Sequence, residues 1–143
     1  MRLTAKVIYA CRAITELALW HDKKVPIQLQ AISKAQHIPE KFLVQLLLRL
    51  KNAHIVSSSR GILGGYNLLR SPTQLSVADV VRAVDDSVIN ENSMPISNGK
   101  NRTDKIFNRL WSDINHTVTE TLEKLTFDTI VAQIKNEQLT YYI

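Results

Sequence analysis

The chain has 143 residues, a mass of 16.2 kDa and a formal net charge of +5, with 45% hydrophobic and 22% charged residues. This length fits one domain, and this composition is typical of a folded globular protein and excludes an intrinsically disordered chain. The sequence contains no apolar run long enough for a membrane-spanning helix and no recognisable secretory signal, so we expect a cytoplasmic protein.

The positive charge is concentrated in the first half of the chain. Residues 1–70 carry eleven Lys or Arg and three Asp or Glu, a balance of +8, whereas residues 71–143 carry seven and ten, a balance of −3. A basic half suits a nucleic-acid phosphate backbone as partner. A solvated, lysine-rich surface is the alternative that charge alone leaves open.

Three helices are predicted in the first third of the chain. Apolar residues recur at helical spacing over residues 3–20, and a shorter apolar face follows over 28–36. Pro39 then opens a third helix that runs to about residue 52, because proline is tolerated in the first helical turn. Two helices joined by a tight turn form a helix-turn-helix pattern at about 28–51, typical of proteins that read the DNA major groove.

The third predicted helix has two different faces. Its inward stripe consists of leucines, namely Leu43, Leu46, Leu47 and Leu50. Residues wholly or partly outside this stripe are Lys41, Val44, Gln45, Leu48, Arg49 and Lys51. An exposed face that mixes amide, cationic and apolar side chains is typical of a helix that contacts base edges.

A β-hairpin is predicted after this helix. Two short β-type runs, residues 55–59 and 66–69, flank a turn that contains three of the chain's four glycines. The glycines lie between strands and do not open a helix, so they do not indicate a phosphate-binding loop. Arg60 begins this turn, where a guanidinium can enter a narrow minor groove; an ordinary exposed arginine is the alternative. The hairpin, about 55–70, is therefore expected to be the wing of a winged helix.

The predicted DNA-binding domain ends with a fourth helix. The segment Ser76 to Asp79 has the form of a capping box, a hydroxyl followed three residues later by an acid, and begins a helix that ends near Asp86. The DNA-binding domain is therefore predicted to span residues 1–86. Residues 87–103, which are rich in Asn and Ser, are predicted to be a loop.

A long helix is predicted over residues 104–125. Its apolar stripe is too long for a small domain to cover, so we expect it to pair with the same helix of a second chain; packing within its own chain is the alternative. The predicted dimerisation residues are Ile106, Phe107, Leu110, Trp111, Ile114, Val118, Leu122 and Leu125. The tail, residues 126–143, is predicted to begin with a short helical turn and to end in an apolar, aromatic segment that docks on the dimer or on a partner.

Four segments carry a resemblance to a known family: Met1–Lys6 with Tyr9-Ala10, Pro39–Leu46, Arg60-Gly61 with Gly64-Gly65-Tyr66, and Ala83–Val88. Over nearly its whole length the chain resembles the IscR/NsrR/CymR-type family of bacterial winged helix-turn-helix transcriptional regulators. The resemblance implies a mainly α fold with a small β-hairpin wing, a winged helix-turn-helix domain and a long C-terminal dimerisation helix. It also implies a homodimeric repressor that binds a palindromic operator on double-stranded DNA.

The resemblance further implies a set of DNA-binding residues. Arg2, Thr4 and Lys6 match an N-terminal segment that lies near the DNA backbone in relatives. The implied positions in the helix-turn-helix and the wing are Gln28, Pro39, Lys41, Phe42, Val44, Gln45, Arg49, Arg60, Gly61, Gly64, Gly65 and Tyr66. Val44 departs from the acidic residue that often discriminates between operators in IscR-like members, so their operator sequence does not transfer to this chain.

A second departure concerns cofactors. Cluster-binding relatives place three cysteines between the fourth helix and the long helix, where this chain has Ser93, Met94, Asn98, Lys105 and Asn108. The single cysteine, Cys11, lies on the apolar stripe of the first helix, which predicts a buried, inert thiol. Because iron–sulfur clusters need thiolate ligands, we expect no cluster at the family's usual site, and no other metal or cofactor.

No nucleophile in a recognisable motif, carboxylate pair or metal-ligand cluster is evident, so the sequence predicts that the chain is not an enzyme. Two alternatives to a simple operator-binding protein stay open. One is a winged-helix adapter that binds proteins. The other is a regulator controlled by a partner protein, as in CymR-like members, or by a small-molecule effector.

Overall fold

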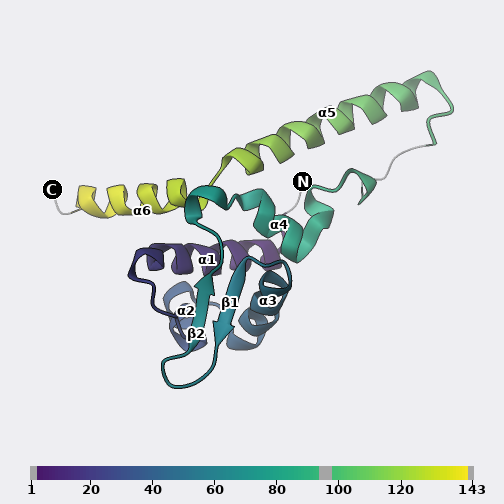
Figure 1. Cartoon of the computed structure of the whole chain (residues 1–143). Helices are drawn as coiled ribbons and strands as arrows, with labels where there is room; N and C mark the ends of the chain where they lie inside the picture. The colour runs from purple at the N-terminus through teal and green to yellow at the C-terminus, as the bar shows by residue number, and fades with distance from the viewer. Residues whose placement is uncertain (1–2, 94–97, 142–143) are drawn as a thin grey trace.

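The computed structural model of the chain describes residues 3–93 and 98–141. These residues form six α-helices, four short 3-10 helices and one two-stranded antiparallel sheet. Figure 1 shows a helical body with the hairpin loop at one end and helices α5 and α6 at the opposite end. The predicted fold class, mainly α with a small hairpin wing, is confirmed. Arg2 and Met94 lie outside the described residues.

The first three helices have the predicted order. They are α1 (Ala5–Leu19), α2 (Leu29–Gln36) and α3 (Glu40–Asn52). Thr4 caps α1, because its Oγ1 accepts a hydrogen bond from the Val7 backbone N–H. Pro39 is the residue immediately before α3 and not its first helical residue, so the helix begins one position later than the sequence predicts.

The hairpin comprises β1 (Val56–Ser59) and β2 (Gly65–Leu68), in a register that pairs Val56 with Leu68 and Ser59 with Gly65. A further pairing was not predicted from the sequence. The segment before α2 adds one residue to the edge of β2: the Ile27 N–H donates to the Tyr66 carbonyl at 2.9 Å, and the Tyr66 N–H donates to the Ile27 carbonyl at 2.8 Å. The wing is therefore bonded to the start of the helix-turn-helix.

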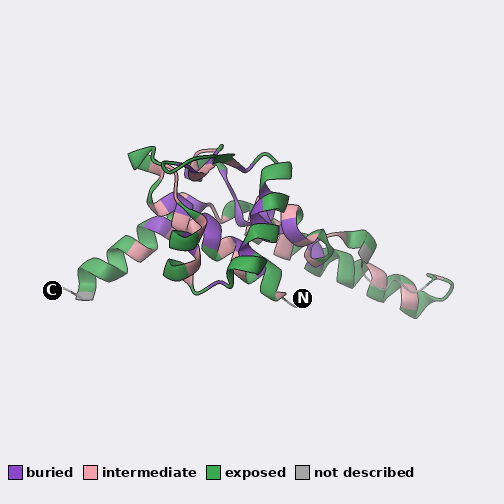
Figure 2. Ribbon diagram, turned by 90° about the horizontal axis from the view of Figure 1, so that it is seen from below, coloured by how far each residue is buried: buried purple, intermediate pink, exposed green. Residues whose placement is uncertain are grey.

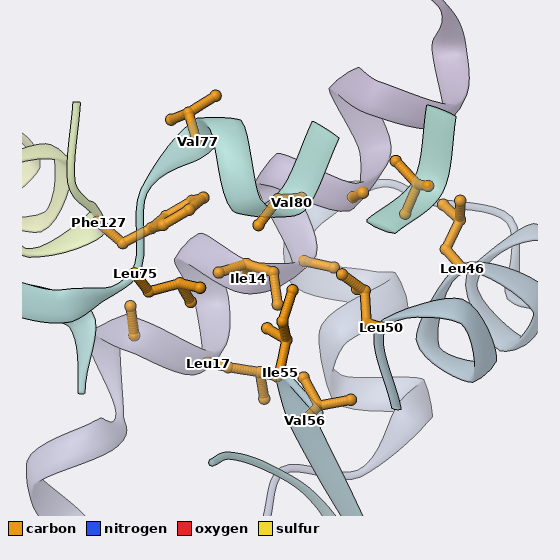
Figure 3. Close-up of a cluster of buried hydrophobic side chains, with 14 of the residues drawn as sticks. Ile14, Leu17, Leu46, Leu50, Ile55, Val56, Leu75, Val77, Val80 and Phe127 are labelled. Atoms are coloured by element: carbon orange, nitrogen blue, oxygen red, sulfur yellow. The ribbon is translucent and has the colours of Figure 1, made fainter. Parts of the chain in front are cut away.

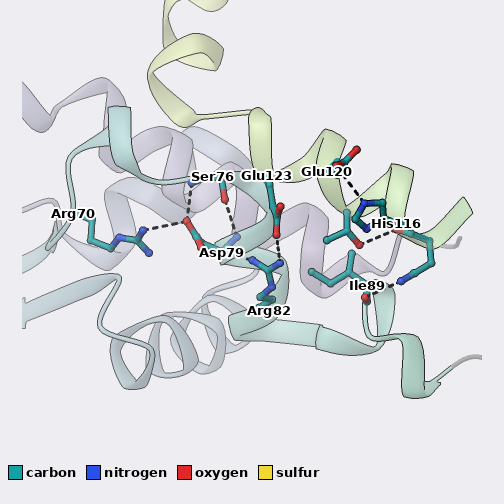
Figure 4. A network of polar contacts seen from close by, with 10 residues as sticks. Arg70, Ser76, Asp79, Arg82, Ile89, His116, Glu120 and Glu123 are labelled. Carbon is teal, nitrogen blue, oxygen red and sulfur yellow. Dashed lines mark hydrogen bonds and ion pairs between the residues drawn. The ribbon is translucent and has the colours of Figure 1, made fainter. Parts of the chain in front are cut away.

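Helix α4 (Val77–Asp85) begins with the predicted capping box. The Asp79 backbone N–H donates to the Ser76 Oγ at 3.2 Å, and the Asp79 carboxylate accepts from the Ser76 backbone N–H at 3.0 Å. Figure 4 shows the same carboxylate facing Arg70, with which it forms an ion pair of 3.2 Å. Farther along α4, Arg82 pairs with Glu123, which joins this helix to α5 (Arg102–Lys124).

The hydrophobic core lies between α1, α3, α4 and the hairpin, as the labelled side chains of Figure 3 show. All four leucines of the predicted inward stripe of α3 are buried: Leu43, Leu46, Leu47 and Leu50. Burial of such side chains is the main favourable contribution to folding, about 2 kcal/mol for each one removed from water. The amphipathic pattern therefore determines which face of α3 is left for other contacts.

The C-terminal tail differs from the prediction. Where the sequence indicated only a short turn, α6 (Phe127–Tyr141) is a helix of 15 residues. Phe127 is fully buried, and its backbone N–H donates to the Leu75 carbonyl at 3.0 Å. Beside it, the Val77 N–H donates to the Leu125 carbonyl at 2.8 Å. These bonds attach the junction of α5 and α6 to the body, whereas most of the two helices beyond it is exposed in Figure 2.

Candidate nucleic-acid interface

Helix α3 leaves a mixed polar and apolar face uncovered. The exposed side chains on it are Lys41, Phe42, Val44, Gln45 and Leu48. The Phe42 ring meets the Tyr9 ring edge to face, with centroids 6.1 Å apart and an angle of 71° between the planes. This contact supports the start of α3 against α1, and it leaves Lys41 and Gln45 free to reach a partner.

Side-chain bonds hold the hairpin against the helix-turn-helix. Gln28 Nε2, at the start of α2, donates to the Ile62 carbonyl oxygen in the hairpin loop at 3.1 Å. Lys51 Nζ, at the end of α3, donates to Ser58 Oγ on β1 at 2.8 Å. The exposed face of α3 and the wing therefore belong to one connected surface. Gln28, which the sequence assigned to DNA contact, here contacts the wing.

The predicted wing glycines have specific backbone roles. Gly65 has a φ of +151°, and a Cβ at this position would lie 2.5 Å from the Ile27 carbonyl oxygen. A Cβ on Gly64 would lie 2.3 Å from the Ser59 carbonyl oxygen. Gly61 has a φ of +101°, with open space where a Cβ would be. These residues shape the wing, and the Tyr66 backbone then pairs with Ile27.

Arg60 lies at the start of the hairpin loop, and its side chain is exposed. In Figure 1 this loop projects from the end of the molecule opposite α5 and α6. The loop itself is closed by a hydrogen bond of 3.0 Å from the Gly64 N–H to the Gly61 carbonyl. Arg60 is thus presented on a defined turn.

Two residues assigned to DNA binding from the sequence have contacts inside the chain. Arg49 Nη1 donates to the Val84 carbonyl oxygen at 2.8 Å, which directs the guanidinium toward α4. Thr4 Oγ1 donates to Asp85 Oδ2 at 3.2 Å, in addition to capping α1. The hydrogen bond from Ser87, with smaller contributions from Thr4 and the Lys6 charge, lowers the pKa of the Asp85 carboxyl.

The apolar stripe of α5 is divided into two parts. Its outer part is exposed, and the large side chains there are Ile106, Phe107, Leu110, Trp111 and Ile114. Phe107 and Trp111 stack, with ring centroids 5.9 Å apart. Val118, Leu122 and Leu125 are half-buried, and the two leucines pack against the core of their own chain. The sequence pattern predicted one continuous stripe and did not locate this division.

The residues do not fit an iron–sulfur cluster. The chain has one cysteine, Cys11 on α1, and burial raises the pKa of its thiol to about 11, which keeps it protonated at neutral pH. In residues 3–93 and 98–141, no group of three His, Cys, Asp or Glu side chains is placed to hold a metal ion. Ser93, Asn98, Lys105 and Asn108, which lie in the region between α4 and the first turns of α5, supply no sulfur donor.

Of the helices in the described part of the chain, none combines the length and the apolar character needed to cross a membrane. The geometry of the site is that of a helix-turn-helix unit with an attached wing.

Comparisons with known proteins agree with this geometry. A family profile described as "Rrf2: Iron-dependent Transcriptional regulator" matches residues 3–133. The chain is 35% identical over 131 residues to the HTH-type transcriptional regulator IscR of Pectobacterium carotovorum, covering 92% of this chain and 79% of that relative. It is 33% identical over 132 residues to IscR of Vibrio vulnificus, covering 92% of this chain and 78% of that relative.

Two solved structures are also similar. CymR, the global cysteine regulator of B. subtilis, has a TM-score of 0.81 and 26% sequence identity, covering 93% of this chain and 98% of that chain. IscR of T. potens has a TM-score of 0.79 and 25% identity, covering 96% of this chain and 91% of that chain. The chain therefore belongs to the Rrf2 family, and it is an IscR-like, DNA-binding winged-helix regulator of transcription.

Proposed function

We propose that the protein represses transcription by binding a palindromic operator as a homodimer, and that it does so without an iron–sulfur cluster. In this proposal α3 enters the major groove, and Lys41, Val44 and Gln45 contact base edges and phosphates there. Arg60 enters the flanking minor groove. A dimer that covers two half-sites represses by excluding RNA polymerase from the promoter.

One observation carries the proposal. The wing is hydrogen-bonded to both helices of the helix-turn-helix, to the start of α2 through Gln28–Ile62 and to the end of α3 through Lys51–Ser58, which supports a major-groove and a minor-groove element held together. They belong to the half of the chain with a balance of +8, which favours a polyanionic partner. Arg49, Gly64, Gly65 and Tyr66 act in this proposal as positioning residues, because their contacts are made within the chain.

The exposed part of α5 supports the homodimer. Five large apolar side chains there are each more than two-fifths exposed, and they lie within nine consecutive residues on a helix that projects from the body. Burial of each of these side chains against the same helix of a second chain stabilises the dimer by about 1 kcal/mol. Pairing of α5 around a twofold axis relates the two α3 helices by that same axis. This symmetry matches the two half-sites of a palindromic operator.

The proposed absence of a cluster rests on the donor set, because the chain has no second cysteine to accompany the protonated Cys11 thiol, and iron–sulfur clusters are held by several thiolates. It is tested by anaerobic reconstitution of the purified protein with iron and sulfide, followed by desalting. We expect no iron or sulfide to remain bound and no cluster absorption, with the same result for Cys11→Ala. Retention of stoichiometric iron and sulfide would contradict this part of the proposal.

DNA recognition is tested by selection of random duplex DNA with the purified protein. The enriched duplex is then titrated at several salt concentrations. We expect a palindrome whose binding weakens steeply with salt. Arg60→Ala should weaken binding at least about tenfold. Arg109→Ala removes the same charge from α5, at the opposite end of the molecule, and should leave affinity nearly unchanged.

The outcomes separate the alternative functions. A palindrome bound with the expected salt dependence would support operator recognition, and loss of transcription from a promoter that carries it would support repression. Failure to enrich any duplex, or equal effects of Arg60→Ala and Arg109→Ala, would contradict the proposal and favour a winged-helix adapter.

A further inference from the structure

The tip of the wing carries two adjacent apolar side chains that have almost no cover. Ile62 is 91% exposed and Leu63 is 89% exposed, the highest values among the exposed large hydrophobic residues of the described chain. Exposed apolar residues on a soluble protein are common singly, but two large ones together at the tip of a loop form a contact surface. Neither residue was assigned a role by the sequence patterns.

The loop that presents these side chains is fixed in shape. The Gly64 N–H donates to the Gly61 carbonyl at 3.0 Å, and Gln28 Nε2 donates to the Ile62 carbonyl at 3.1 Å. Gly64 has no room for a Cβ beside the Ser59 carbonyl oxygen, and Gly61 has a positive φ that other residues adopt rarely. The apolar tip is therefore held in place before any partner arrives.

Two basic residues lie near the tip. Arg60 is the first residue of the loop, and Lys24 lines the groove that Ile62 and Leu63 share with the segment before α2. An apolar centre flanked by cations matches the cross-section of a DNA minor groove, in which base edges lie between two rows of phosphates. Apolar side chains that enter this groove act as wedges, which part the bases and bend the duplex.

We infer that Ile62 and Leu63 form an apolar wedge that enters the minor groove beside Arg60, partly unstacks one base step and bends the operator. This inference rests on the proposed function, since it concerns how the same wing contacts DNA. It adds indirect readout, because pyrimidine–purine steps such as TA and CA unstack more easily than others. The wing would thus favour operators that have a flexible base step at this position. This preference does not depend on a hydrogen bond from any side chain to the bases.

The test uses the duplex enriched by the wild-type protein, with 2-aminopurine placed at successive steps under the wing. Binding of the wild-type protein should raise the fluorescence at one step, and bending should be visible by energy transfer between the duplex ends. The double variant Ile62→Ser, Leu63→Ser should lose both signals. Leu69→Ser, which removes an exposed leucine just after β2, is the matched control and should keep both.

A second measurement exchanges the unstacked TA or CA step for AT. The wild-type protein should lose about tenfold in affinity, whereas the double variant should lose less than about twofold. Circular dichroism and thermal unfolding check that the variant is folded, and an unchanged salt dependence checks that its phosphate contacts remain. Unchanged fluorescence, bending and step preference in the folded double variant would overturn the wedge while leaving operator binding intact. Failure of the wild-type protein to enrich any duplex would contradict both proposals.

Discussion

Arg49 Nη1 lies 2.8 Å from the Val84 carbonyl oxygen, so a side chain of α3 bonds the C-terminal end of α4. This bond fixes how α3 sits on the body. Replacement by methionine keeps much of the aliphatic volume and removes the charged donor. We expect Arg49→Met to lower the free energy of unfolding by about 1 kcal/mol in urea denaturation.

The same variant distinguishes positioning from direct contact with DNA. Arg49→Met should weaken operator binding without changing the slope of log affinity against log salt, because no phosphate contact is lost. Lys41→Met, on the exposed face, should reduce that slope by about 1. A reduced slope for Arg49→Met would show that the guanidinium leaves Val84 and binds phosphate.

Gly65 gives a prediction about the wing. Gly65→Ala places a Cβ against the Ile27 carbonyl and also forces alanine into a positive φ. Gly61→Ala causes only the strain of a positive φ, because no atom lies near its Cβ. We expect Gly61→Ala to cost about 1–2 kcal/mol of stability and Gly65→Ala about 3 kcal/mol. Amide exchange should show Ile27 and Tyr66 losing protection in Gly65→Ala only. Equal exchange in the two variants would contradict the proposed importance of this close approach.

The lowered pKa of the Asp85 carboxyl predicts that the stability of the fold depends on pH. This carboxyl has a lowered pKa in the folded chain, chiefly through the Ser87 hydrogen bond, so it stabilises the fold fully above its unfolded pKa of about 4. That contribution is lost as the pH falls through the lower, folded value. The stability difference between wild type and Asp85→Asn should therefore be constant near neutral pH, begin to shrink near pH 4 and disappear only below the folded pKa. Ser87→Ala should move the Asp85 titration, followed by NMR, toward the ordinary carboxyl pKa.

The exposed half of α5 predicts the oligomeric state. Ile114 is 52% exposed on a projecting helix, and Ile114→Glu introduces a charge that a paired apolar surface cannot cover without a large desolvation cost. Light scattering should detect a dimer for the wild type and a monomer for Ile114→Glu. Leu139→Glu makes the same change on α6, where Leu139 is 63% exposed, and should leave the dimer intact. A dimer that survives Ile114→Glu would place the interface elsewhere.

The sequence predicted those parts of the fold that depend on local periodicity. The four buried leucines of α3 and the Ser76–Asp79 capping box follow from helical spacing and from a hydrogen bond between near neighbours. The Ile27–Tyr66 pairing could not be predicted, because one residue of edge pairing has no alternating pattern. The prediction of a short turn at the start of the tail is wrong, although Phe127, Ile130, Val131 and Ile134 recur at the spacing of the longer helix α6.

The sequence indicates residue types for the candidate interface, but it does not indicate the contacts that these side chains make within the chain. Sequence spacing indicates that Arg49 lies outside the leucine stripe, but it cannot indicate that the guanidinium turns toward the Val84 carbonyl. Similarly, Gln28 has the chemistry of a base-contacting amide and instead bonds the wing. Long polar side chains have several directions open to them, and only the neighbouring elements determine which one is used.

The attachment of α5 at one end has a mechanical consequence. Its base is held by the Val77–Leu125 and Leu75–Phe127 backbone bonds, whereas its outer half projects from the body. The inner half of α5 is also held, because Asn115 Nδ2 donates to the Ile89 carbonyl oxygen at 3.3 Å and Arg82 pairs with Glu123. The projecting part, residues 102–114, is about 20 Å long, so a rotation of about 10° at Asn115 moves its far end by about 3 Å. In a dimer joined through the outer half, this part of the helix acts as a lever arm, and the contact between Asn115 and Ile89 sets the distance between the two winged-helix domains.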